Sequence, residues 1–221
     1  EQAATLTRAR LALLPEVDAL FGVPQRADYH PEIDTGIHTM MVLDQSAWRN
    51  FALPVRFSAL THDLGKAETP ADILPRHIGH EERSVRLTGR LCDRLRIPNE
   101  CRDLALLMAR YHGNIHRAAD LKASTIVTLF ENTDALRRPE RFRQLLDACL
   151  CDYTGRLGWE NRPYDSPAYL LAALATVNAV EAGKIAMACP DKTKIPERIH
   201  AARVRAVKQL LNEAGEQPEQ Q

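Results

Sequence analysis

The sequence predicts an all-α protein, and three observations lead to this fold class. Apolar residues recur at the three- and four-residue spacing of amphipathic helices, and no segment shows the alternation of a half-buried strand. Leu, Ala and Arg are frequent while aromatic residues make up only 5% of the chain, which favours helix formers. With 221 residues the chain can bury a full core. We expect a helical bundle with a core over residues 1–160 and a helical extension over residues 161–221 that packs on it.

Prolines, glycines and capping residues predict where the helices begin and end. The first expected helix stops at Pro15, and Asp34 or Thr35 is the N-cap of the second. Ser124 is the expected cap of a helix later in the chain. The expected helices cover residues 3–14, 34–48, 54–63, 80–95, 98–113, 124–136, 139–155, 168–187 and 196–211.

Charge and cysteine usage restrict the class of protein. Lys plus Arg and Asp plus Glu both number 29, so no overall field attracts nucleic acid or a membrane. No apolar run approaches the ~20 residues of a membrane span, and no secretory signal opens the chain. The five cysteines are odd in number and mostly lie on apolar helical faces, which predicts reduced, buried thiols in a cytoplasmic protein. The chain starts at Glu1 rather than at a methionine, as a fragment of a longer protein would.

The most informative feature is the pair His62-Asp63 at the end of the third expected helix. Side chains on a last helical turn can converge on one point, and Gly65 suits a left-handed cap just beyond it. A neutral imidazole beside a carboxylate suits a borderline divalent metal. A His-Asp pair also occurs by chance, so the doublet alone is not specific.

Four further residues of the metal-binding type lie at other helix ends. His38 and His80 lie near helix starts, and His112 and Asp152 lie near helix ends. A bundle that brings these ends together would place four histidines and two aspartates in one cavity. That set can hold one metal in near-octahedral coordination, or two metals bridged by a carboxylate. Taken singly, each residue has an ordinary explanation, such as a polar group on a solvated face or a cation at a helix C-terminus.

The order of these residues resembles the HD superfamily of metal-dependent phosphohydrolases, an all-helical family named after the doublet. His38, His62-Asp63 and Asp152 match its metal residues, and the remaining two histidines match those of its binuclear members. The resemblance is closest to the C-terminal HD domain of bacterial multifunctional CCA-adding tRNA nucleotidyltransferases. It is carried by residues 14–24, 29–40, 62–66 and 125–139, and it covers residues 12–160 well. The nucleotide-adding head of those enzymes is absent, so nucleotide addition is not assigned to these residues.

The resemblance implies 2′,3′-cyclic phosphodiesterase, 2′-nucleotidase and phosphatase activities supported by Ni or Mg, and the ligand types also admit Mn, Fe, Co or Zn. A phosphate ester is hydrolysed when a metal activates water and cations neutralise the phosphate oxygens. The first metal would be held by His38, His62, Asp63 and Asp152. His80 and His112 would complete a second metal site, with Asp63 as the bridge.

Three cations are candidates for binding the phosphate. Lys66 follows the doublet directly and is expected to contact a phosphate oxygen and to assist catalysis alongside His62 and Asp63. Arg156, four residues beyond Asp152, and Arg76, on a proline-broken loop, are weaker candidates. A helix-terminus cation explains Lys66 equally well. The remaining histidines are expected on the surface, namely His30, His77, His116 and His200, although His77 and His116 lie close enough in the sequence to line the cleft.

The expected partner is a nucleotide or RNA-end phosphate, and tRNA is a further candidate. Basic residues at 137–143 and 192–208 could follow an RNA backbone, although solvated helix faces explain them as well. Two alternative functions stay open: a tRNA-positioning module with a secondary metal site, and a different nucleotidase of the same superfamily. The complete ligand set favours the enzyme over the module, and the extended match around residues 14–66 favours it over the nucleotidase. No membrane partner is expected, and a homodimer stays open.

Overall fold

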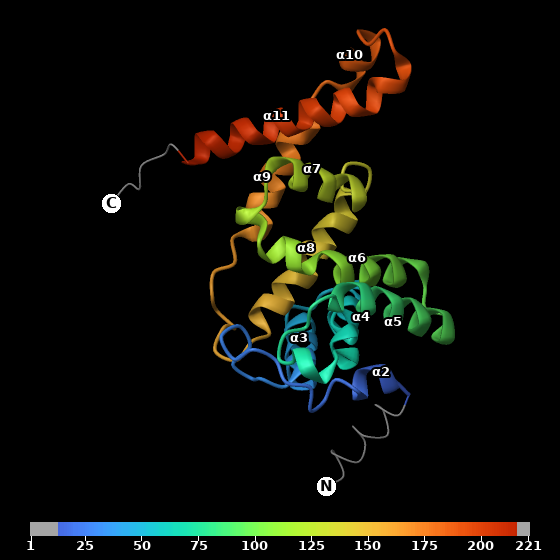
Figure 1. Ribbon diagram of the computed structural model, residues 1–221, viewed down its shortest axis with the longest axis vertical. Coiled ribbons are helices and arrows are strands. Elements are labelled where there is room, and N and C mark those ends of the chain that lie inside the picture. The colour runs from blue at the N-terminus through green and yellow to red at the C-terminus, as the bar shows by residue number, and fades with distance from the viewer. Residues whose placement is uncertain (1–12, 216–221) are drawn as a thin grey trace. The chain divides into compact units, whose positions relative to one another are not determined.

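The computed structural model describes residues 13–215, and in this range the chain consists of helices and connecting loops, as predicted (Figure 1). The only extended pairing among these residues is an isolated bridge between Pro24 and Asp34. The helices are α2 (Pro15–Asp18), α3 (Thr35–Trp48), α4 (Leu53–Thr61), η1 (Leu64–Glu68), η2 (Ala71–Ile73), α5 (His80–Leu95), α6 (Asn99–His116), η3 (Ala118–Asp120), α7 (Ala123–Asn132), α8 (Pro139–Thr154), α9 (Ser166–Asn178), α10 (Ala182–Met187), η4 (Lys192–Lys194) and α11 (Ile195–Gly215). Most of the first expected helix, residues 3–12, lies outside the described range.

The helices group into two compact units. Among the described residues, the first unit comprises 13–116 and 143–164, and the second comprises 117–142 and 165–215. Helix α8 contributes to both units, since its first turn belongs to the second and the rest belongs to the first. This division differs from the expected boundary at residue 160. The reason is that α7 packs on α9 and α11, so residues 117–142 group with the C-terminal helices.

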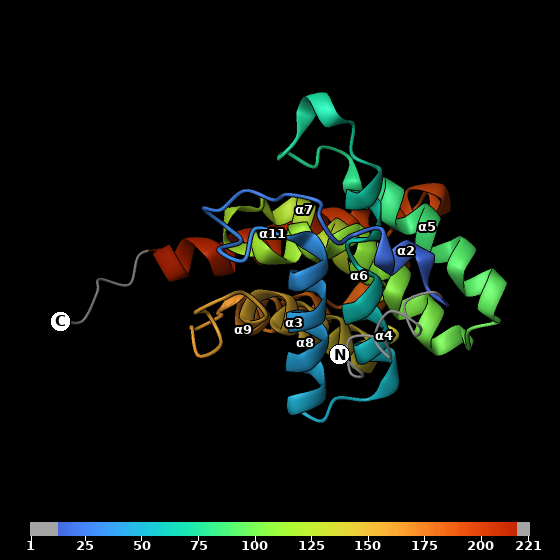
Figure 2. The ribbon, with the colours of Figure 1, turned by 90° about the horizontal axis from the view of Figure 1, so that it is seen from below.

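In the first unit α4 packs against both α3 and α6, and α5 packs against α6 and η1 (Figure 2). The contact between α3, α4 and α8 is closed by Val42, Ala59 and Cys151, each fully buried. Burial of such apolar surface stabilises the fold by roughly 25 cal/mol per Å². The polar residues at the adjoining helix ends are therefore fixed by an apolar core.

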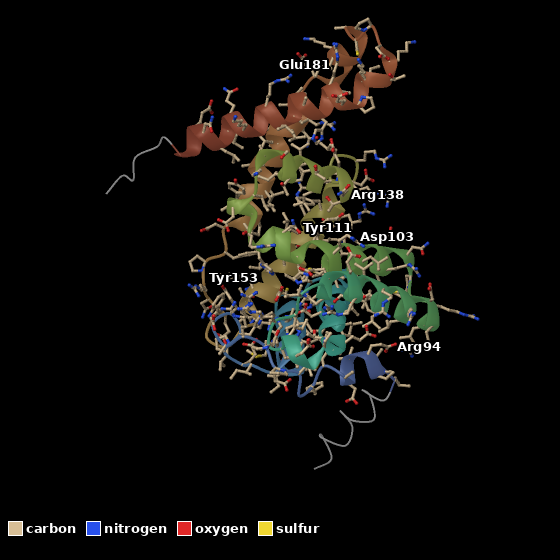
Figure 3. The ribbon with its side chains drawn as sticks, viewed as in Figure 1. Arg94, Asp103, Tyr111, Arg138, Tyr153 and Glu181 are labelled. Atoms are coloured by element: carbon tan, nitrogen blue, oxygen red, sulfur yellow. The ribbon has the colours of Figure 1, made fainter. Side chains whose placement is uncertain are left out.

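Helix α2 packs on the outer side of η1. An apolar cluster joins it to η1 and α5, and consists of Val17, Leu20, Leu64 and Leu91, each fully buried. Arg94 of α5 (Figure 3) reinforces the contact through an ion pair with Glu16, in which Nη2 lies 2.7 Å from Oε2. The segment before α3 is thus attached to the helices that carry the predicted site.

Helix α3 begins at the predicted cap. The Asp34 carboxylate accepts the N–H of Ile37 at 2.9 Å, as an N-cap does, and its second oxygen accepts the N–H of Gly22 at 2.6 Å. Gly22 has a φ of +83°, a conformation that side-chain-bearing residues rarely adopt. The cap therefore also fastens the preceding loop against the first turn of α3, which carries His38.

Gly65 does not form the predicted left-handed cap, because it lies inside η1. Glycine is needed at this position because η1 and α5 approach each other closely. A Cβ at this position would lie 2.3 Å from the carbonyl oxygen of His80 and 2.4 Å from the backbone nitrogen of Ser84. The Gly65 N–H also donates to Ser84 Oγ at 2.8 Å. The missing side chain thus lets η1 touch the first turn of α5.

Three other predicted boundaries differ from the structure. Helix α6 continues past Gly113 to His116, since a glycine inside a well-packed helix costs only about 1 kcal/mol. The N-cap of α7 is Lys122 rather than Ser124, and no side chain caps that helix. The expected helix over residues 168–187 is interrupted, with α9 ending at Asn178 and α10 beginning at Ala182.

The second unit is organised on α11, which packs against α7, α9 and α10. Phe130 and Phe142 form its buried aromatic pair, with ring centroids 5.4 Å apart and nearly perpendicular planes. On the surface of this unit, Glu131 of α7 accepts from His200 Nδ1 at 2.9 Å and from Arg203 Nη1 at 3.3 Å. These contacts hold α11 on α7.

All five cysteines lie in the described range, and they are buried and free of disulfides, as predicted. Burial raises the pKa of Cys151 to about 12, and it raises the pKa of Cys149 well above its usual value. These thiols therefore stay protonated and unreactive at neutral pH. Within residues 13–215, no helix combines the length and apolar character needed to cross a bilayer.

Candidate metal centre

The His62-Asp63 pair lies where α4 ends and η1 begins. His62 is the C-cap of α4, and Asp63, with φ −111° and ψ 14°, starts the tighter turn of η1. This change of helix type places two consecutive side chains in one buried space, with 0% and 2% exposure. All six residues predicted to bind metal meet here in two groups. We call His38, His62 and Asp152 the first triad, and Asp63, His80 and His112 the second triad.

The first triad joins the starts and ends of three helices. His38 is in the first turn of α3, and its Nε2 lies 3.0 Å from Oδ1 of Asp152 in the last turn of α8. His62 Nε2 lies 3.7 Å from the same oxygen. None of the three side chains is more than 3% exposed. The first triad is therefore closed to solvent.

The second triad gathers around one carboxylate oxygen. Asp63 Oδ1 lies 3.4 Å from Nε2 of His80 and 3.6 Å from Nε2 of His112. The other oxygen of Asp63 lies 3.2 Å from His62 Nε2, so this carboxylate reaches both triads. The His80 side chain is 16% exposed. The second triad consequently has an edge that solvent reaches.

Backbone carbonyls set the ring orientation of three of these histidines. Their Nδ1 atoms donate to carbonyl oxygens at 2.8–2.9 Å, in the pairs His62 to Ala59, His80 to His77 and His112 to Met108. A neutral imidazole that donates through Nδ1 has an unprotonated Nε2, which is the atom that binds a metal. The Nε2 atoms of His80 and His112 lie 3.4 Å apart. Because neither then has a proton to donate to the other, a cation bound by both would stabilise the pair.

One buried oxygen at the centre, Asp63 Oδ1, has no hydrogen-bond partner among the described residues, and it faces the Nε2 atoms of His80 and His112. Leaving a buried polar atom unsatisfied costs about 1–3 kcal/mol, and such atoms are rare in folded proteins. An imidazole nitrogen and a carboxylate oxygen are both ligands of divalent metals. The residues present therefore fit a divalent metal of the borderline class.

The electrostatics of the two triads differ. Burial alone would lower the pKa of His62, but the charges of Asp63 and Asp152 outweigh burial and raise this pKa to about 9. In the second triad, burial lowers the pKa of His112 to about 3. Burial raises the pKa of both aspartates, but the neighbouring cations outweigh it, led by Lys66 for Asp63, and hold both values well below normal. Both carboxylates are thus ionised, as metal ligands must be.

Two of the three predicted phosphate-binding cations lie beside the triads. Lys66 Nζ lies 2.7 Å from Asp63 and donates to Gln25 Oε1 at 2.6 Å, in a site that leaves Lys66 only 6% exposed. Arg156 Nη2 lies 3.8 Å from Asp152 Oδ1. Arg76 is exposed on the loop before α5 and takes no part in the ion pairs of the triads.

His116 is not the surface residue that the sequence suggested. Its Nε2 lies 2.6 Å from Asp152 Oδ2, and its Nδ1 lies 2.9 Å from the Tyr164 hydroxyl. Since an ionised carboxylate only accepts, His116 donates through Nε2 and accepts from Tyr164 through Nδ1. This tautomer is opposite to that of the triad histidines, so His116 supports Asp152 rather than offering a lone pair. Its spacing of four residues from His112 is the signal that could have revealed it.

The loop before α3 supplies another residue that sequence reasoning missed. Glu32 Oε1 lies 3.1 Å from His30 Nδ1 and 2.9 Å from His38 Nδ1. Burial would raise the pKa of Glu32, but these histidines outweigh burial and hold it below its ordinary range. A carboxylate behind a ligand histidine fixes the orientation of the ring. No periodicity marks a residue in an irregular loop, so the sequence held no signal for Glu32.

His30 and His77 are also more enclosed than expected. Burial lowers the pKa of each to about 4, so both are neutral at pH 7. His77 lies 2.7 Å from Thr69 Oγ1 through Nδ1 and 3.0 Å from the Pro24 carbonyl oxygen through Nε2. It therefore ties the loop before α5 to the loop before α3.

Comparison with known proteins found a matching family and several relatives. Residues 35–156, which contain all six triad residues, match the model of a family described as "HD domain". The chain is 86% identical over 209 residues to the "Multifunctional CCA protein" of Dechloromonas aromatica (strain RCB), covering 95% of this chain and 51% of that protein.

Two further relatives carry the same name. The protein of Burkholderia lata is 60% identical over 205 residues, covering 92% of this chain and 49% of its own length. The protein of Paraburkholderia phymatum is 60% identical over 203 residues, covering 91% of this chain and 49% of its own length. The chain thus spans about half the length of the curated relatives it matches. No solved structure matches it significantly.

Proposed function

We infer the function from the premise that the chain belongs to the HD-domain family and is a metal-dependent phosphohydrolase. We propose that it hydrolyses 2′,3′-cyclic phosphates, 2′-phosphates and other phosphate monoesters of nucleotides or RNA ends. We further propose that it is the HD part of a CCA-adding enzyme whose nucleotidyltransferase head lies outside this sequence. The observation that carries the proposal is the meeting of both triads at Asp63, whose buried Oδ1 has no hydrogen-bond partner among the described residues.

The triad residues would hold the metal. The first triad with Asp63 would hold one ion, and the second triad would hold another, with Asp63 shared between them. When bound, a divalent metal lowers the pKa of water and neutralises charge on the phosphate oxygens. Ni and Mg are the metals that the resemblance suggests. Four imidazoles favour Ni, Mn, Fe, Co or Zn over Mg, which prefers oxygen ligands.

Residues around the triads would bind the phosphate or orient the metal-binding side chains. Lys66 and Arg156 provide N–H donors and positive charge next to the carboxylates, as recognition of a phosphate requires. Glu32 holds the His38 ring from behind, and His116 holds the Asp152 carboxylate. Arg76 stays the weakest candidate, because it would have to reach the phosphate from an exposed loop.

The test is hydrolysis of 2′,3′-cAMP by metal-stripped protein with Ni, Mn, Mg or Zn added back. We expect turnover to depend on added metal and to be lost in His62→Ala and Asp63→Ala. His200→Ala is the matched control, since His200 belongs to the second unit and pairs with Glu131. Absence of turnover with every metal, in folded protein, would contradict the proposal.

A tRNA-positioning role is the second candidate, and an observation in the second unit favours it. Arg198 and Arg205 of α11 line a cavity of about 310 Å³ beside α10. Cationic side chains in such a hollow can receive backbone phosphates, and their binding weakens steeply with salt. If Arg198→Ala with Arg205→Ala weakens tRNA binding and reduces its salt dependence, RNA contacts this face.

Cytoplasmic location stays a prediction, consistent with the free thiols.

A further inference from the structure

A cluster of aromatic and arginine side chains follows α8 in the first unit. Tyr153 lies in the last turn of α8 (Figure 3), and its ring stacks on Tyr164 with centroids 4.4 Å apart and planes 17° from parallel. Trp159 tilts against Tyr153 at 5.1 Å. Aromatic residues make up only 5% of this chain, so three of them in residues 153–164 form a distinct feature.

Two consecutive turns place Trp159 between two arginines. The Trp159 N–H donates to the Arg156 carbonyl at 2.9 Å, and the Arg162 N–H donates to the Trp159 carbonyl at 3.0 Å. Side chains three residues apart line up in such turns. Gly158, with a φ of +80°, permits the bend. The Arg156 and Arg162 guanidiniums accordingly lie over the indole at 5.0 and 4.2 Å from its centroid.

The cluster is connected to the metal centre by two routes. Arg156 contacts the indole and also lies 3.8 Å from Asp152 Oδ1. Tyr164 binds His116, whose other ring nitrogen binds the second oxygen of Asp152. A ligand whose phosphate contacted Arg156 would therefore have Trp159 next to its remaining part.

The exposure of these side chains is unlike that of a core. The aromatic pair Phe130–Phe142 in the second unit is fully buried, whereas Trp159 is half-buried and Arg162 is exposed. The segment 157–163 is an irregular loop, the kind of element that commonly carries binding residues. Aromatic rings and guanidinium planes at such positions are the groups on which nucleobases stack.

We propose that Trp159, with Arg156 and Arg162, stacks the nucleobase of a substrate whose phosphate lies at the metal centre. The preferred substrates are then nucleoside 2′,3′-cyclic phosphates and 2′-nucleotides rather than base-free esters. The exposed guanidinium of Arg162 either yields its place on the indole to the base or stacks on the outer face of the base. The identity of the phosphate end follows from the proposed function, and the base subsite is new.

The kinetic test compares a substrate that has a base with one that lacks it, 2′,3′-cAMP and glycerol 1,2-cyclic phosphate. Trp159→Ala should raise KM for 2′,3′-cAMP about tenfold, within the range measured for loss of base stacking, and leave the base-free substrate within about twofold. Trp159→Phe should keep KM for 2′,3′-cAMP close to the value of the unchanged protein. Equal losses on both substrates, or no loss on either, would overturn the proposal.

Trp48 provides the matched control. It is 76% exposed and also carries an arginine, with Arg49 at 5.3 Å from its ring. It lies ten residues beyond His38 on α3, about 15 Å along the helix axis. Trp48→Ala should leave KM for both substrates unchanged. If it raises KM as Trp159→Ala does, the effect does not belong to the proposed subsite.

A binding measurement separates this inference from the proposed function. Trp48→Phe leaves Trp159 as the only tryptophan, since the chain has two. Titration with 2′-AMP in the presence of Zn²⁺ should quench its fluorescence saturably, while glycerol phosphate should not. Quenching without any hydrolysis would support the base subsite and contradict the proposed hydrolysis of these nucleotides. Hydrolysis without quenching would support the proposed hydrolysis and contradict the base subsite.

Discussion

The two triads contain the same residue types, yet they are supported in different ways. In the first triad, side-chain carboxylates hold His38, which lies between Glu32 and Asp152, while His62 donates to the Ala59 carbonyl. In the second triad, backbone carbonyls hold both histidines through Nδ1. The first triad is closed, whereas His80 in the second is partly exposed.

The histidines of the two triads also differ in their protonation. In the first triad, the pKa of His62 is raised to about 9, so without metal this ring carries a proton at neutral pH. Burial lowers the pKa of His112 to about 3, so this ring is neutral, and the cation that faces the second triad is Lys66, which pairs with Asp63. The first triad thus carries positive charge on one of its own histidines, whereas the second triad is paired with a lysine outside it and lies where a substrate can approach.

The largest effect is expected from the residue that both triads share. Asp63→Asn keeps the size of the side chain but removes the charge that faces His62, His80 and His112. We expect turnover to fall about 1000-fold, in line with losing several kcal/mol of charge stabilisation, and metal content to fall with it. Elemental analysis and 2′,3′-cAMP turnover measure both. Asp72→Asn on the exposed η2 is the control, and near-normal metal content in Asp63→Asn would remove Asp63 from the ligand set.

Metal affinity should depend on pH in the first triad. A metal must displace the proton of His62, whose pKa is raised to about 9, so affinity should rise about tenfold per pH unit between pH 6.5 and 8.5. His112, with a pKa lowered to about 3, adds no dependence in this range. Calorimetry in two buffers of different ionisation enthalpy counts the released protons. An affinity that stays flat over this range would show that His62 is already neutral.

A smaller effect on metal binding is expected from Glu32, which contacts His38 of the first triad. Glu32→Gln should weaken metal binding about 10- to 100-fold, the usual cost of losing a carboxylate that orients a ligand histidine. The second triad should keep its affinity, because its histidines donate to backbone carbonyls. A metal titration that resolves two steps would locate the loss, and an equal loss in both steps would reject the difference in support.

The smallest effect concerns the packing that positions the second triad. Gly65→Ala should destabilise the fold by about 1–3 kcal/mol, since its Cβ would press on the backbone at His80 and Ser84. Gly89→Ala on α5 is the matched control. It meets no atom within 4 Å and should stabilise the helix by up to about 1 kcal/mol. Urea unfolding compares the two, and similar stabilities would show that η1 and α5 adjust freely.

The sequence was sufficient for the helical class, and it predicted that the six triad residues would lie together. Five of them lie at or near helix ends, where caps and prolines mark the position, whereas α6 runs four residues past His112. The placement of Asp34 as a cap followed from the same local chemistry. Such features depend on neighbours within a few residues, which a sequence displays directly.

The features that sequence reasoning missed depend on contacts between distant segments. His116 was hidden because Gly113 suggested a helix end, whereas packing carries α6 one turn further. Glu32 comes from a loop, and the need for glycine at residue 65 arises from the backbone of α5. Lys66 was predicted to face a phosphate, and the structure adds that Asp63 and Gln25 already hold it.

The hydrogen bonds from Nδ1 to the helix backbone have a consequence for protein design. His62 and His112 obtain their orientation from helix carbonyls three or four residues earlier, which every helix provides whatever its side chains are. A histidine inside or at the end of a helix therefore brings its own orienting partner to any scaffold. His80 and His38 would each need a loop as well, since His80 donates to His77 before α5 and His38 contacts Glu32 before α3.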